Sequence, residues 1–325
     1  MFEFELIKTF FDRGPARHAT LGIGDDCALV ELASNETLAI STDMLVEGRH
    51  FFADVSPRSL GHKALAVNLS DLAAMGAQPQ SFTLAMALPA AEPAWLREFS
   101  RGLFEIADRF GCELIGGDTT QGPLNLSITV LGRLPKGVAL RRDGAQIGDD
   151  LWVSGRLGGP FYALRERYAA TALAASLVAF PAHVPQACID KLERPEPRLS
   201  LGLALRHLAS SAIDLSDGLM GDVGHLCERS RCGARIRVDQ IPLFESLGHL
   251  SSSESLALLL AGGDEYELCF TAATENRAHI RRIAHDLGLP LTIIGEMSAG
   301  DAIDLVDQDD RPVVFGGYSH QHFAP

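Results

Sequence analysis

The sequence predicts an α/β chain of the α+β type, folded as two domains in which helices pack on sheets. Its 325 residues suit two compact domains or one large one. Hydrophobic residues make up 46% of the chain but aromatic residues only 7%, so small aliphatic side chains must fill the core. Helical stretches and alternating, strand-like stretches are intermixed from one end to the other.

The predicted N-terminal domain covers residues 1–137. A first helix is expected over residues 3–12, and the stretch TLAISTDMLV predicts a strand that runs into a loop. The next stretch, SPRSLGHKALAVNLSDLAAMGA, predicts a helix with Ser56 as its N-cap and Pro57 at its first position. Four further elements follow: the strand SFTLAMALP, the amphipathic helix EPAWLREFSRGLFEIADRFG ended by Gly111, the short strand CELIGGD and the alternating strand LNLSITVLGRL.

The predicted C-terminal domain covers residues 138–325. The stretch PKGVALRRDGAQIGDD is rich in turn formers and charge, and we expect it to join the two domains. The strand LWVSG and a long helical region over residues 158–208 come first. The remaining elements are SAIDLS (strand), GLMGDVGHLCERSR (helix), ARIRVDQI (strand), residues 253–260 (helix), EYELCFTA (strand), ENRAHIRRIAHDLG (helix) and LTIIG (strand).

Charge and cysteine usage narrow the class of function. The formal net charge of −14 argues against nucleic acid or an anionic membrane as the main partner. An anionic substrate is still possible if divalent cations lie between it and the carboxylates. The six cysteines form no C-x-x-C pair, which predicts reduced, mostly buried thiols in a cytoplasmic protein. The apolar stretch TALAASLVAF is too short to span a bilayer.

Acidic residues recur beside Gly, Ser or Thr where an apolar segment is predicted to end. The six places are GIGDD, STD, NLSD, IGGD, IDLSD and AGGDE. Any one of them is explained by turn or capping chemistry. Asp71 is more informative, because it lies within a predicted helix and its carboxylate needs solvent or a positive partner. That partner is either a metal ion, Lys63 or a backbone cap.

Oxygen donors without a His or Cys cluster favour a hard cation such as Mg²⁺. Because Mg²⁺ shares its coordination sites with substrate phosphates, several such acids predict several Mg²⁺ ions that hold a polyphosphate. Glycine-rich turns support this interpretation, since their N–H groups are able to donate to phosphate. The sequence has no Walker A, Rossmann or kinase H-R-D motif.

Two basic residues lie near these acids in the sequence. Arg142, in the predicted junction, either reaches a phosphate or is solvated like most loop arginines. His50 follows the STD motif closely, so it either contacts the substrate or is an ordinary surface histidine.

Six stretches of the chain, in order and spacing, resemble the thiamine-monophosphate kinase family: GIGDDCAL, AISTDMLVEGRHF, KALAVNLSDLAAMGAQP, LIGGDTTQGPL, SAIDLSDGL and GGDEYELCF. The resemblance implies an aminoimidazole-ribonucleotide synthetase-like fold whose N-terminal sheets pair in a homodimer. It implies transfer of a phosphoryl group from ATP to thiamine monophosphate, with several Mg²⁺ ions and no catalytic side chain.

The resemblance also implies the site residues. The implied Mg²⁺ ligands are Asp26, Ser41, Thr42, Asp43, Asp71, Asp118, Asp214 and Asp217. The implied ATP contacts are Gly117, Asp118, Arg142 and Ser216. The implied substrate contacts are His50, Asp264, and an aromatic near the C-terminus, Tyr318 or Phe323.

Three questions stay open at this point. Relatives read GGEDYEL where this chain reads GGDEYEL, so either Asp264 or Glu265 meets the substrate. A sister enzyme of the same fold, such as a selenophosphate synthetase, is one alternative function. It would need a reactive Cys in a flexible glycine-rich N-terminus, and Cys27 is not in such a tail. A non-enzymatic acidic metal-binding protein is the other alternative.

Overall fold

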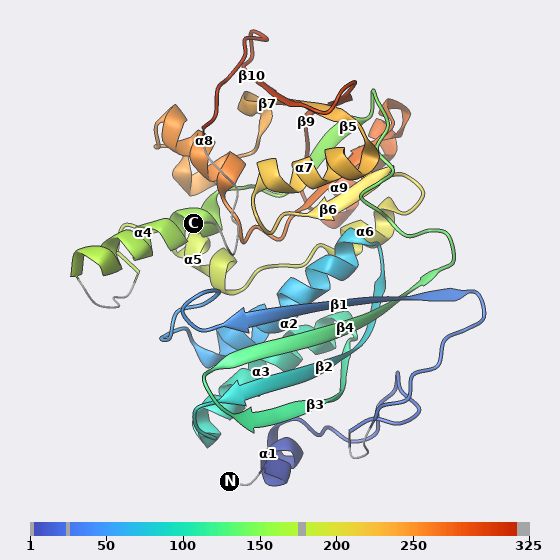
Figure 1. Ribbon diagram of the computed structural model, residues 1–325, viewed down its shortest axis with the longest axis vertical. Helices are drawn as coiled ribbons and strands as arrows, with labels where there is room; N and C mark the ends of the chain where they lie inside the picture. Colours follow the sequence, from blue (N-terminus) through green and yellow to red (C-terminus); the bar gives the residue numbers. More distant parts are fainter. Residues whose placement is uncertain (1–2, 24–26, 175–179, 317–325) are drawn as a thin grey trace. The chain divides into compact units, whose positions relative to one another are not determined.

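The computed structural model of the protein describes residues 3–23, 27–174 and 180–316 (Figure 1). The chain divides into two compact units. Unit 1 comprises Met1–Leu72 and Ala77–Ala139, and unit 2 comprises Ala73–Gly76 and Leu140–Pro325. The short segment Ala73–Gly76 belongs to unit 2, although the residues before and after it in the sequence belong to unit 1. No local sequence pattern predicted this assignment.

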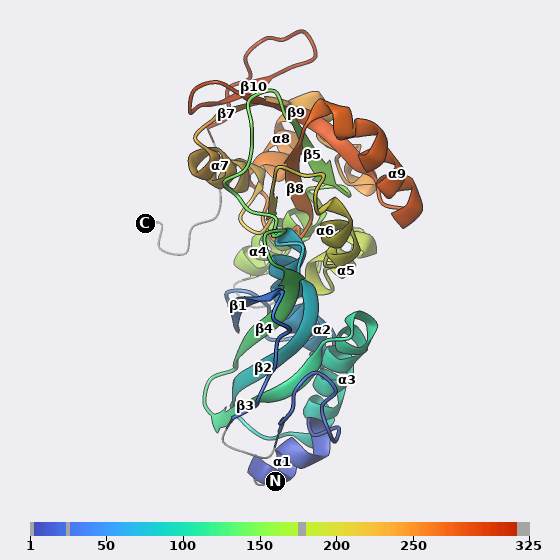
Figure 2. The same ribbon diagram turned by 90° about the vertical axis from the view of Figure 1, so that its right-hand side faces the viewer.

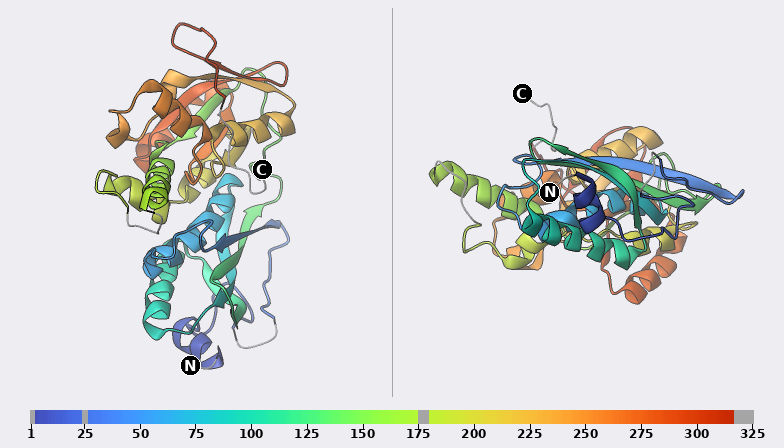
Figure 3. Two further views of the ribbon diagram at one scale, coloured as in Figure 1. Left: turned by 60° about the vertical axis from the view of Figure 1, so that its left-hand side comes forward. Right: turned by 90° about the horizontal axis from the view of Figure 1, so that it is seen from below.

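Unit 1 is a four-stranded sheet with helices on one face (Figure 3). The helices that the structure describes there are α1 (Glu3–Phe10), α2 (Pro57–Ala74) and α3 (Pro93–Phe110). The strands are β1 (Glu36–Val46), β2 (Gln78–Leu88), β3 (Glu113–Gln121) and β4 (Asn125–Pro135). Their order in the sheet is β1-β4-β2-β3, and only β2 and β3 run parallel.

Local signals set the ends of α2 and α3 as predicted. Helix α2 begins at Pro57, and the Ser56 hydroxyl accepts a hydrogen bond of 3.1 Å from the Ser59 amide. Helix α3 ends at Gly111, which adopts the left-handed conformation with φ 62°. Both features satisfy backbone groups that a helix end leaves without intrahelical partners.

Two glycines let α2 and α3 approach each other closely. A Cβ added to Gly61 would lie 2.1 Å from the Phe99 carbonyl oxygen, and one added to Gly102 would lie 1.9 Å from that of Arg58. The contact is therefore backbone against backbone, and no larger residue fits at either position without moving a helix.

The opposite face of the sheet carries exposed apolar side chains. Side chains alternate along β1, and Leu45 is buried on the face that the helices cover. Ile40 and Met44 point to the other face, where they are 62% and 55% exposed. Thr42 lies between them on that same face.

Unit 2 is built on a six-stranded sheet of order β10-β7-β9-β5-β8-β6. The strands are β5 (Asp150–Ser154), β6 (Ser211–Asp214), β7 (Gly233–Arg237), β8 (Leu268–Ala272), β9 (Leu291–Ser298) and β10 (Ile303–Val306). The α-helices described there are α4 (Gly159–Ala174), α5 (Gln186–Glu193), α6 (Leu199–Leu205), α7 (Leu219–Ser230), α8 (Ser252–Ala261) and α9 (Arg277–Leu287). Helices α7 and α9 lie on opposite sides of the sheet (Figure 2), so it is covered on both faces.

The structure corrects three predicted elements and adds one strand that was not predicted. Helix α1 ends at Phe10 rather than at residue 12. In place of one helical region over residues 158–208, the described parts of that stretch form three helices, with prolines between α5 and α6. Strand β8 begins at Leu268 rather than at residue 265. Strand β10, which pairs parallel with β7, is too short to give a sequence signal.

The cysteines agree with the prediction from sequence. All six are free thiols, of which five are buried and only Cys27 is exposed. Within the described ranges, no helix has the length and apolar character needed to cross a membrane.

We predict that Gly102→Ala lowers the free energy of unfolding by about 1–3 kcal/mol, because the added methyl group overpacks the contact between α2 and α3. Urea denaturation measures this change. Gly224→Ala in α7 is the matched control, since an added Cβ there meets no atom within 4 Å. The control is expected to gain about 0.5–1 kcal/mol from the better helix propensity of Ala. Equal effects of the two substitutions would contradict the packing explanation.

Candidate active site

Three of the predicted acid and hydroxyl residues of unit 1 lie on the helix-covered face of the sheet. Ser41 and Asp43 share the orientation of the buried Leu45 on β1. The Ser41 hydroxyl donates a hydrogen bond of 2.5 Å to Asp71 Oδ2 on α2. The half-buried Asp71 therefore has the Ser41 hydroxyl as a partner, which the sequence did not predict.

Strand β1 continues through the STD motif because it pairs with β4 as far as Val46, and Asn68 on α2 binds the opposite edge of the strand. The Asp43 amide donates to Asn68 Oδ1 at 3.0 Å, and the Asn68 side-chain amide donates to the Ala64 carbonyl at 3.0 Å. Asn68 thereby satisfies a backbone group on the free edge of the sheet. The prediction that Asp43 ends a strand is wrong, because the pairing with β4 continues as far as Val46.

Thr42 and Asp118 lie on the other face, away from α2. The Thr42 hydroxyl is 2.8 Å from the hydroxyl of Thr129 on β4. Asp118 lies within β3, not at its end, and pairs with the exposed Ala85. Strands β1 and β3 are the two edges of the sheet, three intervals or about 14 Å apart at about 4.8 Å each. One chain thus does not bring Asp118 together with Asp43.

Gly117 is required by packing, whatever else it does. Its φ is 151°, and an added Cβ would lie 1.9 Å from the Leu84 carbonyl oxygen on β2. A side chain there would clash with the backbone of the neighbouring strand. The IGGD stretch therefore lies within strand β3 and not in the predicted turn, and Gly117 permits the close parallel pairing of β2 and β3.

His50 is held in one tautomer. The Val46 amide donates to His50 Nδ1 at 3.0 Å, so Nδ1 is the acceptor nitrogen and the ring proton is on Nε2. The Lys63 ammonium, on a residue only 3% exposed, donates to the His50 carbonyl at 3.3 Å. His50 is half-buried, and it is oriented to offer its Nε2–H as a hydrogen-bond donor.

In unit 2, three acids lie around the turn that links β6 to α7. Strand β6 ends at Asp214 rather than at residue 216, and Asp217 follows in the turn. Asp222, 2% exposed in the first turn of α7, accepts hydrogen bonds from the amides of Ser216 (3.1 Å) and Asp217 (3.3 Å). Burial, together with the charges of Asp214 and Asp217, raises the pKa of Asp222 to about 8. The three carboxylates therefore repel one another, and a bound cation would relieve that repulsion.

The GGDEYEL segment lies directly against this turn. The Asp264 amide donates to the Ser216 carbonyl at 2.9 Å, and the Tyr266 amide donates to the Leu215 carbonyl at 2.8 Å. The Tyr266 hydroxyl donates to Asp264 Oδ1 at 3.1 Å. The structure thus brings Asp264 together with Ser216.

Asp264 and Tyr266 both adopt left-handed backbone conformations, with φ 62° and 50°. Such a conformation costs an L-residue about 1–2 kcal/mol, and it explains why β8 starts only at Leu268.

The two acids of the GGDEYEL segment have different environments. Glu265 is 2% exposed, and it accepts hydrogen bonds from the Gly158 amide at 2.5 Å and from the Lys191 ammonium at 3.0 Å. Asp264 is only half-buried. Burial raises the pKa of Glu265, and the nearby Lys191 opposes that shift. Since Glu265 is held by internal partners, Asp264 is the better placed of the two to meet a substrate.

Lys191 also contacts Glu267, which is buried. Burial alone would lower the pKa of the Lys191 ammonium, but the charges of Glu265 and Glu267 outweigh it and raise the pKa. Burial would raise the pKa of Glu267, but Lys191 and Arg198 together lower it. Lys191 is therefore a cation and Glu267 an anion at neutral pH.

The remaining predicted residues give less information. Arg142 is exposed, and its carbonyl accepts a hydrogen bond of 2.7 Å from the Ser230 hydroxyl. Asp26, Tyr318 and Phe323 lie outside the described residues. Across the ranges that the structure describes, no group of three or more His, Cys, Asp or Glu side chains is placed to hold a metal ion.

Comparison with known proteins decides the family. Residues 24–134 match the family described as AIR synthase related protein, N-terminal domain, and residues 151–308 match its C-terminal domain. The chain is 44% identical to the thiamine-monophosphate kinase of Salmonella typhimurium LT2 over 99% of this chain and 98% of that protein. The chain belongs to the thiamine-monophosphate kinase family.

Solved structures of the family agree with this assignment. The crystal structure of thiamine-monophosphate kinase from Stenotrophomonas maltophilia K279a superposes with a TM-score of 0.82 at 45% identity, covering 89% of this chain and 91% of that one. The structure of AaThiL complexed with AMPPCP and TMP superposes with a TM-score of 0.75 at 28% identity, covering 92% of each chain. The family resemblance and the two-domain fold predicted from sequence are confirmed.

The donor atoms suit the Mg²⁺ that the family resemblance implies. They are carboxylate and hydroxyl oxygens, which hard cations prefer, and no described His or Cys joins them in a metal-binding group. In unit 2, Asp214, Asp217 and Asp222 supply carboxylate oxygens of the same kind around one turn.

Sequence reasoning missed four residues that shape the site: Asn68, Lys191, Asp222 and Glu267. For two of them a signal existed. Asn68 is a polar residue three positions before Asp71 within an apolar helix, so it lies on the same helical face. Asp222 lies in the first turn of the helix that follows Asp217. Lys191 and Glu267 are distant in sequence, and no local pattern links them.

We predict that Asp71→Asn weakens Mg²⁺ binding by at least about 10- to 100-fold, the loss that altered neighbours of metal ligands alone produce. Asn is able to accept the same hydrogen bond from Ser41, so the variant is expected to keep its fold. Calorimetric titration with Mg²⁺ in the presence of nucleotide measures the change. Asp108→Asn, which removes an exposed carboxylate paired with Arg13, is the control. Unchanged affinity in the Asp71 variant would contradict its assignment as a metal ligand.

Proposed function

We propose that the protein transfers the γ-phosphoryl group of ATP to the phosphate of thiamine monophosphate, which gives ADP and thiamine diphosphate. The observation that carries this proposal is the 44% identity to a thiamine-monophosphate kinase over 99% of the chain. The complex of AaThiL with both AMPPCP and TMP supports it, because that relative holds a nucleotide analogue and the phosphate acceptor together.

The acceptor chemistry explains why the site needs no catalytic base. A phosphate monoester is already an anionic nucleophile near neutral pH, so its attack requires alignment and relief of charge repulsion rather than proton removal. Bound Mg²⁺ would supply that charge compensation. The side chains of this protein would hold the ions and orient the two phosphates, and we assign none of them to proton transfer.

The proposal assigns roles to residues of both units. The proposed ligands of several Mg²⁺ ions are Asp26, Ser41, Thr42, Asp43, Asp71, Asp118, Asp214 and Asp217. The proposed ATP contacts are Gly117, Asp118, Arg142 and Ser216. The proposed substrate contacts are His50, Asp264, and Tyr318 or Phe323. Because the Thr42 side chain points away from Asp71 and bonds to Thr129, its main-chain oxygen is the better candidate ligand.

The direct test is to incubate the protein with ATP, Mg²⁺ and thiamine monophosphate and to separate the products chromatographically. Equal formation of ADP and thiamine diphosphate is expected, with loss of both when a chelator removes Mg²⁺. Formation of ADP without thiamine diphosphate would contradict the proposal.

His50 is proposed to bind the acceptor phosphate. Its fixed Nε2–H is a donor, and Nδ1 is occupied by the Val46 amide, so the ring is arranged to donate a hydrogen bond. A hydrogen bond to a charged group contributes about 1.5–3 kcal/mol. Free thiamine lacks the phosphate and carries a neutral hydroxyl instead, so it should be a poor substrate.

We predict that His50→Ala raises the KM for thiamine monophosphate by about 10- to 100-fold, the equivalent of that lost hydrogen bond, with a much smaller effect on the KM for ATP. Steady-state kinetics with each substrate varied in turn measures both constants. The exposed His285, altered in the same way, is the control. An unchanged acceptor KM with a collapsed kcat would show that His50 acts in the chemical step instead.

We further propose that two copies of the chain pair through the uncovered sheet face of unit 1. Ile40 and Met44 form an exposed apolar surface there, which a second copy related by a two-fold axis would cover. Thr42 and Asp118 both lie on this uncovered face but at opposite edges of the sheet, so pairing would bring Asp118 of the partner subunit to β1. We infer that it completes the metal site at the edge strand that carries Thr42 and Asp43.

Subunit mixing tests this arrangement. Asp71→Asn and Asp118→Asn homodimers should each be inactive and should sediment as dimers at micromolar concentration. Mixed after reversible unfolding in equal amounts, they should recover about a quarter of wild-type activity, because random pairing gives half heterodimers with one intact site each. No recovery would place both residues in one subunit's site, and a sedimenting monomer would exclude the dimer.

The cytoplasmic location stays a prediction from the reduced cysteines.

A further inference from the structure

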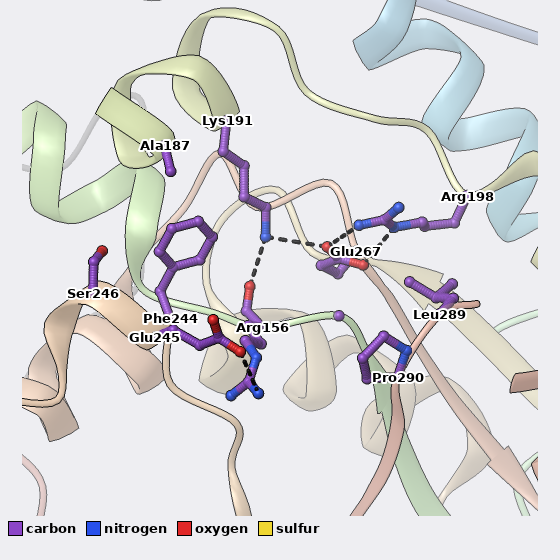
Figure 4. Close-up of a pocket in the computed structure, with 11 residues that line it drawn as sticks. Arg156, Ala187, Lys191, Arg198, Phe244, Glu245, Ser246, Glu267, Leu289 and Pro290 are labelled. Carbon is purple, nitrogen blue, oxygen red and sulfur yellow. Dashed lines mark hydrogen bonds and ion pairs between the residues drawn. The ribbon is translucent and has the colours of Figure 1, made fainter. Parts of the chain in front are cut away.

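A buried ion network lies behind the segment that carries Asp264. It contains two carboxylates, an ammonium and a guanidinium: Glu265, Glu267, Lys191 and Arg198. Lys191 comes from α5, Arg198 immediately precedes α6, and the two acids precede β8. Figure 4 shows Lys191 and Arg198 converging on Glu267 beside a cavity of about 690 Å³.

Lys191 has no donor left for a ligand in this cavity. Its Nζ is 2.6 Å from the Arg156 carbonyl, 3.0 Å from Glu265 Oε2 and 3.1 Å from Glu267 Oε1. An ammonium has three N–H groups, and these three acceptors use them all. Arg198 forms a bidentate contact with Glu267. Both cations are therefore paired with the buried acids of this network.

The side chains of the segment alternate between this network and the candidate site. Glu265 and Glu267 are buried in the network, and Glu267 also accepts a hydrogen bond of 2.6 Å from the Ser154 hydroxyl. Asp264 and Tyr266 point the other way, are half-buried, and are joined by the hydrogen bond from Tyr266 to Asp264. The position of Asp264 thus depends on where the next residue is anchored.

Glu265 lies between two residues in left-handed conformations, an arrangement that persists only if its surroundings fix it. Its side chain is fixed by one neutral donor, the Gly158 amide, and one cation, Lys191. Arg198 already pairs with Glu267. Removing Lys191 would therefore leave Glu265 as a buried carboxylate without a charge partner, and it would be expelled or protonated.

We propose that Lys191 is a positioning residue for the acceptor substrate: by anchoring Glu265, it fixes the left-handed turn that presents Asp264. This inference rests on the proposed role of Asp264 as a substrate contact. In this proposal Glu265 has an internal structural role, and Asp264 contacts the substrate.

Lys191→Met tests the anchor. The KM for thiamine monophosphate is expected to rise about tenfold or more, with kcat and the KM for ATP changed less than about threefold, the pattern of a lost binding contact. Lys191→Arg keeps a cation and should recover most of the loss. Arg156→Gln is the matched control, because its side chain lies at the same cavity but contacts neither buried acid: it pairs with the exposed Glu245 and donates to the Leu243 carbonyl at 3.3 Å. The control should leave all three constants unchanged.

A double-mutant cycle separates positioning from a general loss of stability. If Lys191 acts through Glu265, then Lys191→Met should add little to the acceptor KM in a Glu265→Ala background. Fully additive effects, or equal rises in both KM values, would overturn the proposal. A lower melting temperature with unchanged kinetics would overturn it as well. If Lys191→Met does not fold, Glu265→Gln, which keeps the shape and weakens the ion pair, should show a smaller shift of the acceptor KM alone.

Hydrogen exchange distinguishes this inference from the proposed function. The amides of Asp264 and Tyr266, which donate to the turn after β6, should exchange faster in Lys191→Met than in the wild type or in Arg156→Gln. Wild-type protein that does not phosphorylate thiamine monophosphate would refute the proposed function while leaving this measurement valid. Unchanged exchange in an active Lys191→Met enzyme would refute the anchor alone.

Discussion

Three main-chain hydrogen bonds join the turn after β6 to the GGDEYEL segment, and the chemistry of unit 2 depends on them. Asp264 and Tyr266 donate to the turn, and the Leu215 amide donates back to the Glu267 carbonyl at 2.8 Å. These bonds are independent of side-chain identity, so they set the spacing between the predicted metal acids and the predicted substrate acid before any side chain contributes. Side chains then adjust that framework: Asp222 from the α7 side and Glu265 from the side of the ion network.

The acids of unit 1 are positioned differently from those of unit 2, because they lie on a helix and on strands and not around a turn. Alternation along β1 sends Asp43 toward α2 and Thr42 away from it, while the Ser41 hydroxyl ties the strand to Asp71. Beside them, the Asn68 side chain accepts a hydrogen bond from the Asp43 amide at the edge of the strand. The result is a rigid platform in which each carboxylate direction is fixed by backbone geometry.

Signals that act over a few residues were readable from the sequence. The cap at Ser56, the helix stop at Gly111 and the unusual position of Asp71 within a helix all follow from local rules, and the structure contains all three. The family resemblance extended this to the fold. What the sequence did not reveal depends on contacts between distant segments. Strand β1 continues past Asp43 because it pairs with β4 as far as Val46, while Asn68 bonds to the Asp43 amide. Only the partner Lys191 shows that Glu265, and not Asp264, faces inward.

The balance of charge in the buried network has an evolutionary consequence. Two acids and two bases balance in this largely buried network, so a single substitution that removes one of these charges leaves a net charge there. During evolution, that destabilising net charge is avoided only if an acid and its base are replaced together or in quick succession. Lys191 and Glu265 are 74 residues apart in the chain, but they should therefore be conserved or replaced as a pair among related proteins.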